Sequence, residues 1–326
     1  MREIPVVRTA DLTPLIDEVQ LIEAVTQGLV DLANGSSNAP MPGLLLSQDP
    51  PGDCHIKFAR SASLGLIVVK AATGFYRNGD VGLPVNDGLV TVFSGMTGEL
   101  RCVIDDGGLL TGMRTAATGV IAARLGWDDR RRTVGVVGTG HQARLQLGWA
   151  SRHLTDRPVQ LFGRSIEKAK ALAAQLSADG IAVEVHDDLE AFAAEAGTII
   201  LCTSAMSPIL QAHHLRPGHH IVSLGADGPG KMELSNDIYS SATRIAVDDL
   251  AQAQHRGDFS AAMQLGGLAL GSVQSIGELL SKGQKLRSWP EEVTLVNLCG
   301  TAACDLAAIA YLLTLHDRKG GSLRRA

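Results

Sequence analysis

The residues with the clearest chemical purpose lie at 133–143, TVGVVGTGHQA. Apolar and small residues at 133–137 predict a buried parallel strand, and Gly138, Gly140 and Ala143 follow it at the spacing G-x-G-x-x-A. The first glycine allows a tight turn, the second lets the backbone approach a pyrophosphate, and the small third residue lets the next helix pack closely. We therefore predict that a dinucleotide binds to Gly138, Thr139, Gly140, His141, Gln142 and Ala143.

The end of the next predicted strand indicates which dinucleotide is preferred. An NAD site usually places an acidic residue there to accept hydrogen bonds from the ribose. Here the run 159–162 is followed by Gly163, Arg164 and Ser165, and the first acid is Glu167. A guanidinium beside a hydroxyl suits a 2′-phosphate, which it can bind bidentately. We expect NADP(H) to be favoured over NAD(H); the alternative is an exposed arginine without a ligand.

From residue 133 onward, strand-like and helix-like runs alternate. Strands are predicted at 159–163, 181–186, 198–203, 220–225, 244–248 and 293–298, and the clearest helices at 166–178 and 188–196. This alternation is typical of an α/β fold with a doubly wound parallel sheet, whose ligands bind at the carboxyl ends of the strands. A last helix, 301–316, has one strongly apolar face that would allow it to return to the N-terminal part.

Residues 1 to about 115 show a different pattern. Strand-like runs are predicted at 43–47, 55–59, 64–71 and 89–104, and helices at 15–32 and 109–126, the second with Thr111 as N-cap. The simplest interpretation of the first 115 residues is a smaller α+β domain with an antiparallel sheet and one helix. Because the open edges of such a sheet can be covered by a partner subunit, we expect a homodimer. A domain boundary is expected between 115 and 132, where an arginine-rich linker precedes the glycine turn.

Composition limits the classes of partner. The 326 residues are 45% hydrophobic and 19% charged, with a net charge of −5. Such a chain offers no basic stripe, so neither nucleic acid nor a membrane surface is expected as a partner. No signal-peptide core is visible, and the five cysteines form no C-x-x-C pair. These features predict a cytoplasmic protein with reduced thiols.

Five longer motifs carry a family resemblance. They are VVKAATGF at 68–75, LLTGMRTAATG at 109–119, VGVVGTGHQAR at 134–144, SLGADGPGKMEL at 223–234 and LCGTAACDLA at 298–307. Together they resemble the ornithine cyclodeaminase and μ-crystallin family along nearly the whole chain. The resemblance implies a dimeric enzyme with a Rossmann domain that binds NAD(P), here 119–301. It also implies a substrate-binding and dimerisation domain, here 1–118 with 302–326.

The resemblance assigns roles to four charged residues. Arg114 would hold the substrate carboxylate, a role that suits a fixed cationic fork. Lys70 matches the active-site lysine, and burial could lower its pKa enough for proton transfer. Asp227 matches the catalytic acid beside the substrate nitrogen, and Lys231 would contact the cofactor or a loop carboxylate. The alternatives are an exposed helix arginine, a structural ion pair for Lys70, and a helix cap ahead of Pro229 for Asp227.

Other residues complete the expected site. Lys57 or His55 is expected to supply a substrate contact, because no glutamate stands where the cyclodeaminases would place one. Further cofactor contacts implied by the resemblance are Thr115, His141, Gln142, Thr203, Leu224 and Asn86. The histidines in AHHLRPGHH, 212–220, are interpreted as a solvated loop with no carboxylate nearby, and no metal is expected.

These features favour an NAD(P)H-dependent oxidoreductase acting on the C–N bond of an L-amino acid or its imine or ketimine. Scattered aspartates at 87, 105 and 106 suggest a basic amino acid such as arginine, and are equally compatible with turns. One alternative is a cyclodeaminase that recycles bound NAD. The other is a non-catalytic NADP-binding protein similar to μ-crystallin.

Overall fold

The computed structural model describes residues 3–75, 77–228, 230–266, 268 and 270–320. The chain forms two compact units: unit 1 runs to Arg114 and resumes at Thr301, and unit 2 is Thr115–Gly300. The first division falls inside one continuous helix, α3 (Leu109–Leu125), four residues before the domain boundary at 118/119 that the resemblance implies. The reason is local: the Thr115 carbonyl already accepts a hydrogen bond from Gln146 of unit 2.

Unit 1 is built on a seven-stranded sheet with the order β1-β7-β6-β5-β4-β2, in which β3 also pairs with β4. Its pairs are antiparallel except that β1 runs parallel to β7, which corrects the expectation of a purely antiparallel sheet. Strands β1 and β7 are far apart in the sequence and are not joined by a hairpin, so the connection does not require them to run antiparallel. The strands are β1 (Val6–Arg8), β2 (Ser37–Asn38), β3 (Gly43–Gln48), β4 (Pro51–Ser61), β5 (Leu66–Phe75), β6 (Asn86–Ser94) and β7 (Leu100–Asp105).

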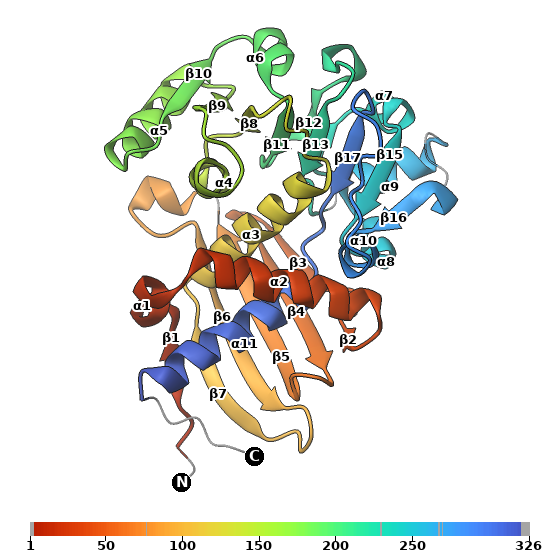
Figure 1. The fold of residues 1–326 in the computed structure, drawn as a ribbon. Helices are drawn as coiled ribbons and strands as arrows, with labels where there is room; N and C mark the ends of the chain where they lie inside the picture. The colour runs from red at the N-terminus through yellow and green to blue at the C-terminus, as the bar shows by residue number, and fades with distance from the viewer. Residues whose placement is uncertain (1–2, 76, 229, 267, 269, 321–326) are drawn as a thin grey trace. The chain divides into compact units, whose positions relative to one another are not determined.

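Helices α2 (Glu18–Ala33) and α11 (Ala302–Arg318) pack together, and α11 also contacts β4 and β5 (Figure 1). Helix α2 begins at Glu18 because the Asp17 carboxylate accepts the N–H groups of Val19 and Gln20. The predicted start at residue 15 was too early, since 13–15 form a separate 3₁₀ turn. The return of the last helix to the N-terminal part is confirmed, and a short helix, α1 (Thr9–Leu12), was not predicted.

Unit 2 contains an eight-stranded parallel sheet with the order β10-β9-β8-β11-β13-β17-β15-β16, which confirms the doubly wound fold. The chain runs outward from β8 through β9 to β10 and then returns to β11, so the switch point lies between β8 and β11. Strands β8, β11, β13 and β17 are buried throughout, as their continuous apolar runs predict. The strands are β8 (Val134–Val137), β9 (Val159–Phe162), β10 (Val183–His186), β11 (Thr198–Leu201), β13 (His220–Ser223), β15 (Arg244–Val247), β16 (Val273–Ser275) and β17 (Thr294–Asn297).

Helices connect these strands. They are α4 (His141–His153), α5 (Ile166–Ala178), α6 (Leu189–Glu195), α7 (Asn236–Ser241), α8 (Leu250–Ala253), α9 (Gly257–Gln264) and α10 (Ile276–Ser281). A separate two-stranded sheet, β12 (Met206–Leu210) with β14 (Met232–Leu234), was not predicted. All five cysteines are free. Among the described residues, no helix combines the length and apolar character that a membrane crossing requires.

Candidate functional site

The first group of predicted residues lies on the sheet face of unit 1 that contacts α11. Lys57 in β4 and Lys70 in β5 are direct cross-strand neighbours, and both are buried. The Lys70 ammonium donates to Asp305 Oδ1 of α11 at 2.7 Å, and Nε of Arg114 lies 2.8 Å from the same oxygen. Lys57, Lys70, Arg114 and Asp305 form a buried charged group, called the cation cluster below.

The charges of the cation cluster do not balance. Burial lowers the pKa of Lys70; attraction to Asp305 opposes this effect, and repulsion from Arg114 adds to it. Burial alone would raise the pKa of Asp305, but Arg114, Lys70 and Lys57 together hold it well below its usual range. Three cations thus lie around one carboxylate, so a further carboxylate would be stabilised here.

Asp106 is a second buried acid close to Lys70, but helix α3 uses its carboxylate. Asp106 accepts the N–H of Leu110 at 2.8 Å and the hydroxyl of Thr111 at 2.8 Å. It therefore caps α3; the prediction that Thr111 is the cap was wrong, because the helix has already begun at Leu109. Since its oxygens already accept these hydrogen bonds, Asp106 does not bind a cationic substrate side chain as predicted. The other two aspartates of that prediction, Asp87 and Asp105, are exposed.

His55 and Asn86 lie near an acid that sequence analysis did not consider. His55 Nε2 is 3.6 Å from Oδ1 of Asp53, which lies two residues earlier in β4. A Cβ added at Gly74 would lie 3.2 Å from Asp53 Oδ1 and 3.5 Å from Asn86 Oδ1, so these side chains flank the same point of β5. The structure therefore places His55 beside Asp53, and Asn86 in unit 1.

The glycine turn of unit 2 has the geometry that dinucleotide binding needs. Gly138 has φ +131°, a conformation that favours glycine, and its N–H donates to Phe162 O at 2.9 Å. Helix α4 then begins at His141, and among the described residues no side chain caps its N-terminus. A Cβ at Gly140 would meet no atom within 4 Å, whereas Ala143 is fully buried. The open side of Gly140 and the N–H groups of the first helical turn fit a pyrophosphate.

The end of β9 lies beside this turn. A Cβ at Gly163 would overlap the methyl group of Thr139. Arg164 is exposed and forms no hydrogen bond or ion pair with the other described residues, so it is available to an anionic group. Ser165 caps α5 by accepting the N–H of Lys168 at 3.3 Å, and donates to Glu167 at 2.9 Å. Ser165 thus has a structural role in addition to the predicted cofactor contact.

Asp227 lies in the turn after β13, held by two cations. Lys231 Nζ donates to its carboxylate at 2.8 Å, and Arg256 Nη1 donates to its carbonyl oxygen at 3.0 Å. Lys231 therefore meets a loop carboxylate, one of the two contacts expected for it. Leu224 is buried and its N–H donates to Leu201 O. The alternative role of Asp227 ahead of Pro229 involves a residue outside the described ones.

Two buried acids that were not predicted from the sequence organise these groups. Asp305 and Glu233 lie inside motifs that were used only for the resemblance, LCGTAACDLA and GADGPGKMEL. The Glu233 carboxylate accepts both the N–H and the hydroxyl of Thr203, a predicted cofactor contact. The sequence did contain a signal for them, because each is an acidic residue inside an otherwise apolar run. An acid in such a position is buried only when it is paired.

The histidines at 213–220 differ from the solvated loop that was predicted. His214, His219 and His220 are buried, and Glu190 lies 3.5 Å from His213 Nε2 and 3.9 Å from His214 Nε2. A carboxylate is therefore nearby, because α6 brings Glu190 from a distant part of the chain. His214 Nδ1 accepts the N–H of Gln211, which leaves the proton on Nε2 facing Glu190. This tautomer favours a hydrogen-bonded histidine over a metal ligand.

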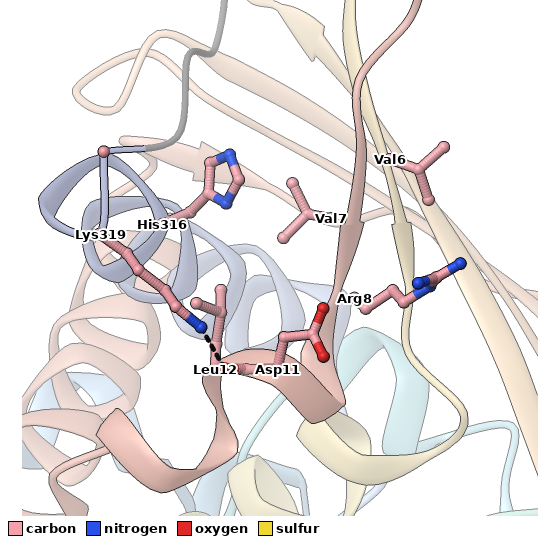
Figure 2. Close-up of a pocket in the computed structure, with 8 residues that line it drawn as sticks. Val6, Val7, Arg8, Asp11, Leu12, His316 and Lys319 are labelled. Atoms are coloured by element: carbon pink, nitrogen blue, oxygen red, sulfur yellow. Dashed lines mark hydrogen bonds between the residues drawn. The ribbon is translucent and has the colours of Figure 1, made fainter.

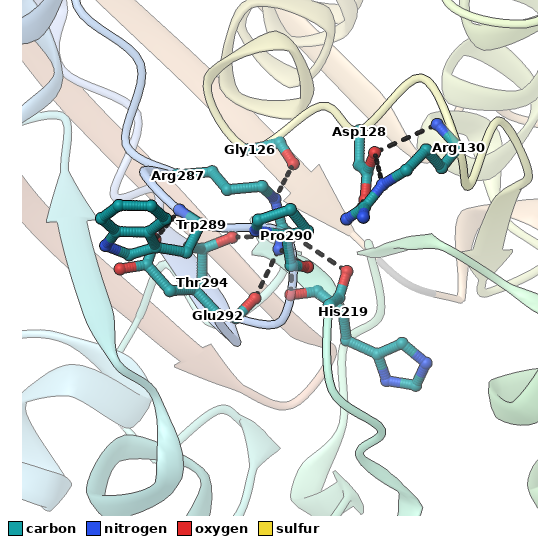
Figure 3. A network of polar contacts seen from close by, with 10 residues as sticks. Gly126, Asp128, Arg130, His219, Arg287, Trp289, Pro290, Glu292 and Thr294 are labelled. Carbon is teal, nitrogen blue, oxygen red and sulfur yellow. Dashed lines mark hydrogen bonds and ion pairs between the residues drawn. The ribbon is translucent and has the colours of Figure 1, made fainter.

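Two surface hollows lie apart from the predicted residues. One, of about 350 Å³, is lined by β1, α1 and the end of α11, where Lys319 donates to the Asp11 carbonyl (Figure 2). The other, of about 330 Å³, is lined by residues such as Asp128, Arg131 and Pro290. Next to it, Arg287 bonds the backbone at the amino end of the unit 2 sheet (Figure 3). Neither hollow contains a predicted site residue.

The fold of unit 2 and its glycine turn define a dinucleotide-binding class of α/β protein. The model of the ornithine cyclodeaminase/mu-crystallin family matches residues 5–319, and the chain belongs to this family.

Similar proteins include both redox enzymes and a cyclodeaminase. An uncharacterized cyclodeaminase of Sinorhizobium fredii is 30% identical over 84% of this chain and 84% of its own length. The structure of an archaeal alanine dehydrogenase dimer with bound NAD has a TM-score of 0.88 and 28% identity, and covers 99% of each chain. The iminosuccinate reductase of Paracoccus denitrificans, in complex with NAD+, has a TM-score of 0.86 and 25% identity, and covers 98% of each chain.

Proposed function

We propose that this protein is an NAD(P)(H)-dependent oxidoreductase that acts on the C–N bond of an α-amino acid or its imine, including cyclic ketimines. The observation that carries the proposal is the cation cluster. Lys57, Lys70 and Arg114 surround Asp305 with surplus positive charge in a buried position. A substrate carboxylate would complete this arrangement, and a carboxylate is common to amino acids and their imines.

The dinucleotide would bind to unit 2. Residues 138–143 would hold the pyrophosphate, and Arg164 would hold a 2′-phosphate, so we propose that NADP(H) is favoured over NAD(H). The bound nicotinamide supplies or accepts the hydride. Both similar structures described above hold NAD, so assays with each dinucleotide test the preference directly.

Asp227 would manage the proton at the substrate nitrogen. In amine oxidation its carboxylate would accept a proton from the nitrogen, and in imine reduction it would hold the protonated imine. Lys231 and Arg256 fix the carboxylate and the carbonyl of this residue, so its position is set before substrate arrives.

The proposed site suits a substrate with a small or apolar side chain as well as one with a basic side chain. The argument for a basic amino acid such as arginine now depends on exposed Asp87 and Asp105, because Asp106 is occupied. Lys57, next to Lys70, repels a nearby cationic side chain. Screening amino acids with each oxidised dinucleotide, and keto acids with amines or cyclic imines with each reduced one, will identify the substrate.

Two alternative functions, a cyclodeaminase and a non-catalytic dinucleotide-binding protein, can be tested by product analysis and by variants. The resemblance to a cyclodeaminase favours a reaction in which the dinucleotide is recycled, so product would appear without net change in dinucleotide. A non-catalytic binder would take up dinucleotide and turn over nothing. If Asp227→Asn leaves turnover of every accepted substrate intact, the proposed catalytic role of this residue is wrong.

We also propose that the protein is a homodimer. On the sheet face of unit 1 opposite Lys57 and Lys70, Ile56, Phe58 and Leu89 are 38%, 39% and 46% exposed. An apolar sheet face of this kind is typical of a subunit interface. Sedimentation equilibrium should give twice the chain mass; a monomer at micromolar concentration would contradict the proposal.

A further inference from the structure

Glu233 connects the two strand-end turns that carry the proposed cofactor and proton-transfer groups. Its side chain is fully buried. Oε1 accepts the N–H of Thr203 at 2.6 Å and its hydroxyl at 2.9 Å, whereas Oε2 accepts the N–H of Gly225 at 2.8 Å and the Ser223 hydroxyl at 3.0 Å. One carboxylate thus fixes the turn after β11 to the turn after β13.

These two turns border the predicted functional groups. A Cβ at Gly138 would lie 3.4 Å from Thr203 Cγ2, so Thr203 adjoins the glycine turn. Gly225 precedes Asp227 by two residues, and a Cβ at Gly225 would overlap the backbone of Thr203. A displacement of Glu233 would therefore move both the dinucleotide turn and the Asp227 turn.

The residues at the start of α9 contact both Glu233 and the Asp227 turn. Asp258 Oδ1 accepts the N–H of Glu233 at 2.8 Å. The preceding Arg256 holds the Asp227 carbonyl, and a Cβ at Gly257, where φ is +54°, would overlap the Ala226 carbonyl oxygen. Three consecutive residues of one segment thus contact both Glu233 and the Asp227 turn.

Proton counting at Ser223 determines the state of Asp258. The Ser223 hydroxyl oxygen lies 3.0 Å from Glu233 Oε2 and 3.2 Å from Asp258 Oδ2, but a hydroxyl carries one proton. Burial raises the pKa of Glu233, but three other donors, the Thr203 N–H and hydroxyl and the Gly225 N–H, oppose this effect, so Glu233 suits the ionised role better than Asp258. Both contacts are satisfied if Asp258 is protonated and donates to Ser223, which then donates to Glu233.

We propose that Glu233 is a positioning residue that sets the Thr203 and Asp227 turns, and that protonated Asp258 holds Glu233 in place through Ser223. The inference rests on the proposed function of Asp227. Burial, together with the charge of Glu233, raises the pKa of Asp258 to about 7, so the proton is held below neutral pH and is lost as pH rises through about 7. The titratable groups on elements packed against α9 are Glu233 of β14, Asp237 and Tyr239 of α7, and Asp249 at the start of α8.

The test compares variants that change the proton count. Asp258→Asn can accept the Glu233 N–H and donate to Ser223, so it imitates protonated Asp258. Dinucleotide affinity, measured by calorimetry without turnover, should fall in the wild type as pH rises through about 7 and remain constant in Asp258→Asn. If Asp258→Asn shows the same pH dependence as the wild type, or loses affinity at every pH, the proposed role of Asp258 is wrong.

Glu233→Gln tests the positioning role itself. Its amide would place a donor against either the Thr203 N–H or the Gly225 N–H, so one of the two turns should move away and the link between them should be lost. We expect kcat to fall about 100-fold, as for a displacement of about 1 Å, with weaker dinucleotide binding. Glu278→Gln, an exposed change on α10, is the matched control.

Ser223→Ala provides a second test of the inference in case Glu233→Gln does not fold. It removes one link of the chain and should show a smaller loss in the same direction, with an altered pH dependence. Normal kcat and dinucleotide affinity in folded Glu233→Gln, or in Ser223→Ala, would overturn the inference. Since affinity is measured apart from turnover, a wild type that binds dinucleotide but turns over nothing would contradict the proposed function alone.

Discussion

Two arginines, the buried Arg114 of unit 1 and the partly buried Arg287 of unit 2, show how the same side chain can serve stability or binding. Arg287 in unit 2 directs its donors at five carbonyl oxygens, those of Gly126, Gly218, His219, Pro290 and Glu292 (Figure 3). Arg114 in unit 1 instead shares one Asp305 oxygen with Lys70, and Lys57 adds further positive charge. The charged neighbours thus distinguish the two side chains: Arg287 lies among carbonyl groups, whereas Arg114 lies among other cations around one carboxylate.

The largest effect is expected from removing the carboxylate that the cation cluster shares. Asp305→Ala leaves Lys57, Lys70 and Arg114 buried without this anion, and an uncompensated buried charge costs about 3–5 kcal/mol. Urea unfolding should show this loss in the free energy of unfolding. Asp317→Ala, an exposed change on the same helix, is the control. Equal stabilities of the two variants would show that the Asp305 carboxylate does not compensate the buried cations.

Removing Arg287 should affect stability and leave chemistry alone. Arg287→Ala deprives several partly buried carbonyl groups of their donor, so the free energy of unfolding should fall by about 3 kcal/mol. The kcat of the folded fraction should be unchanged. Arg130→Ala, which removes an exposed partner of Asp128, should leave the unfolding curve unaltered. A large loss of kcat in folded Arg287→Ala would contradict the claim that Arg287, unlike Arg114, serves only the stability of the fold.

Arg114→Ala should give the opposite pattern. Loss of a charge-assisted contact with the substrate carboxylate should raise KM about 100-fold, equivalent to about 2.7 kcal/mol. Asp305 keeps Lys70 as a partner, so unfolding should change less than in Arg287→Ala. Arg114→Lys retains the charge without the planar fork and should recover part of the loss. An unchanged KM would exclude Arg114 from substrate binding.

The smallest effect concerns pH at the Arg287 end of the sheet. Burial lowers the pKa of His220 to about 4, and burial with nearby Arg131 does the same for His219. Since the unfolded chain binds these protons more readily, stability is fully present above about pH 6.5 and is lost as pH falls toward about 4. Urea melts at about pH 7 and pH 5 should show this loss.

A matched pair of histidine variants checks the source of that pH dependence. His220→Gln should weaken it, whereas His255→Gln, at an exposed position, should leave it intact. Equal pH dependence in His220→Gln and the wild type would mean that the buried ring is not responsible.

Much of the fold follows from local pattern. Alternating runs and the glycine turn predicted the parallel sheet of unit 2, because buried strands are apolar throughout and the turn geometry is specific. The short strands β12 and β14 were missed, since three to five residues with mixed burial give little periodicity. The parallel direction of β1 depends on pairing with a strand almost a hundred residues later, which no local pattern reveals.

The site could be predicted only where each residue carries its own signal. Lys70 and Arg114 stood out as charges in apolar surroundings or in a specific motif. Their partner Asp305 lies 235 residues from Lys70, so the pairing arises only when α11 returns to the sheet. The histidines at 213–220 were misread for the same reason, because Glu190 reaches them through tertiary packing.

The most direct test of the proposed reaction compares dinucleotide redox change with product formed. With the accepted amino acid or imine, near-ultraviolet absorbance of the reduced nicotinamide should change by one equivalent per molecule of product. Product that accumulates without any net change in dinucleotide would contradict the account.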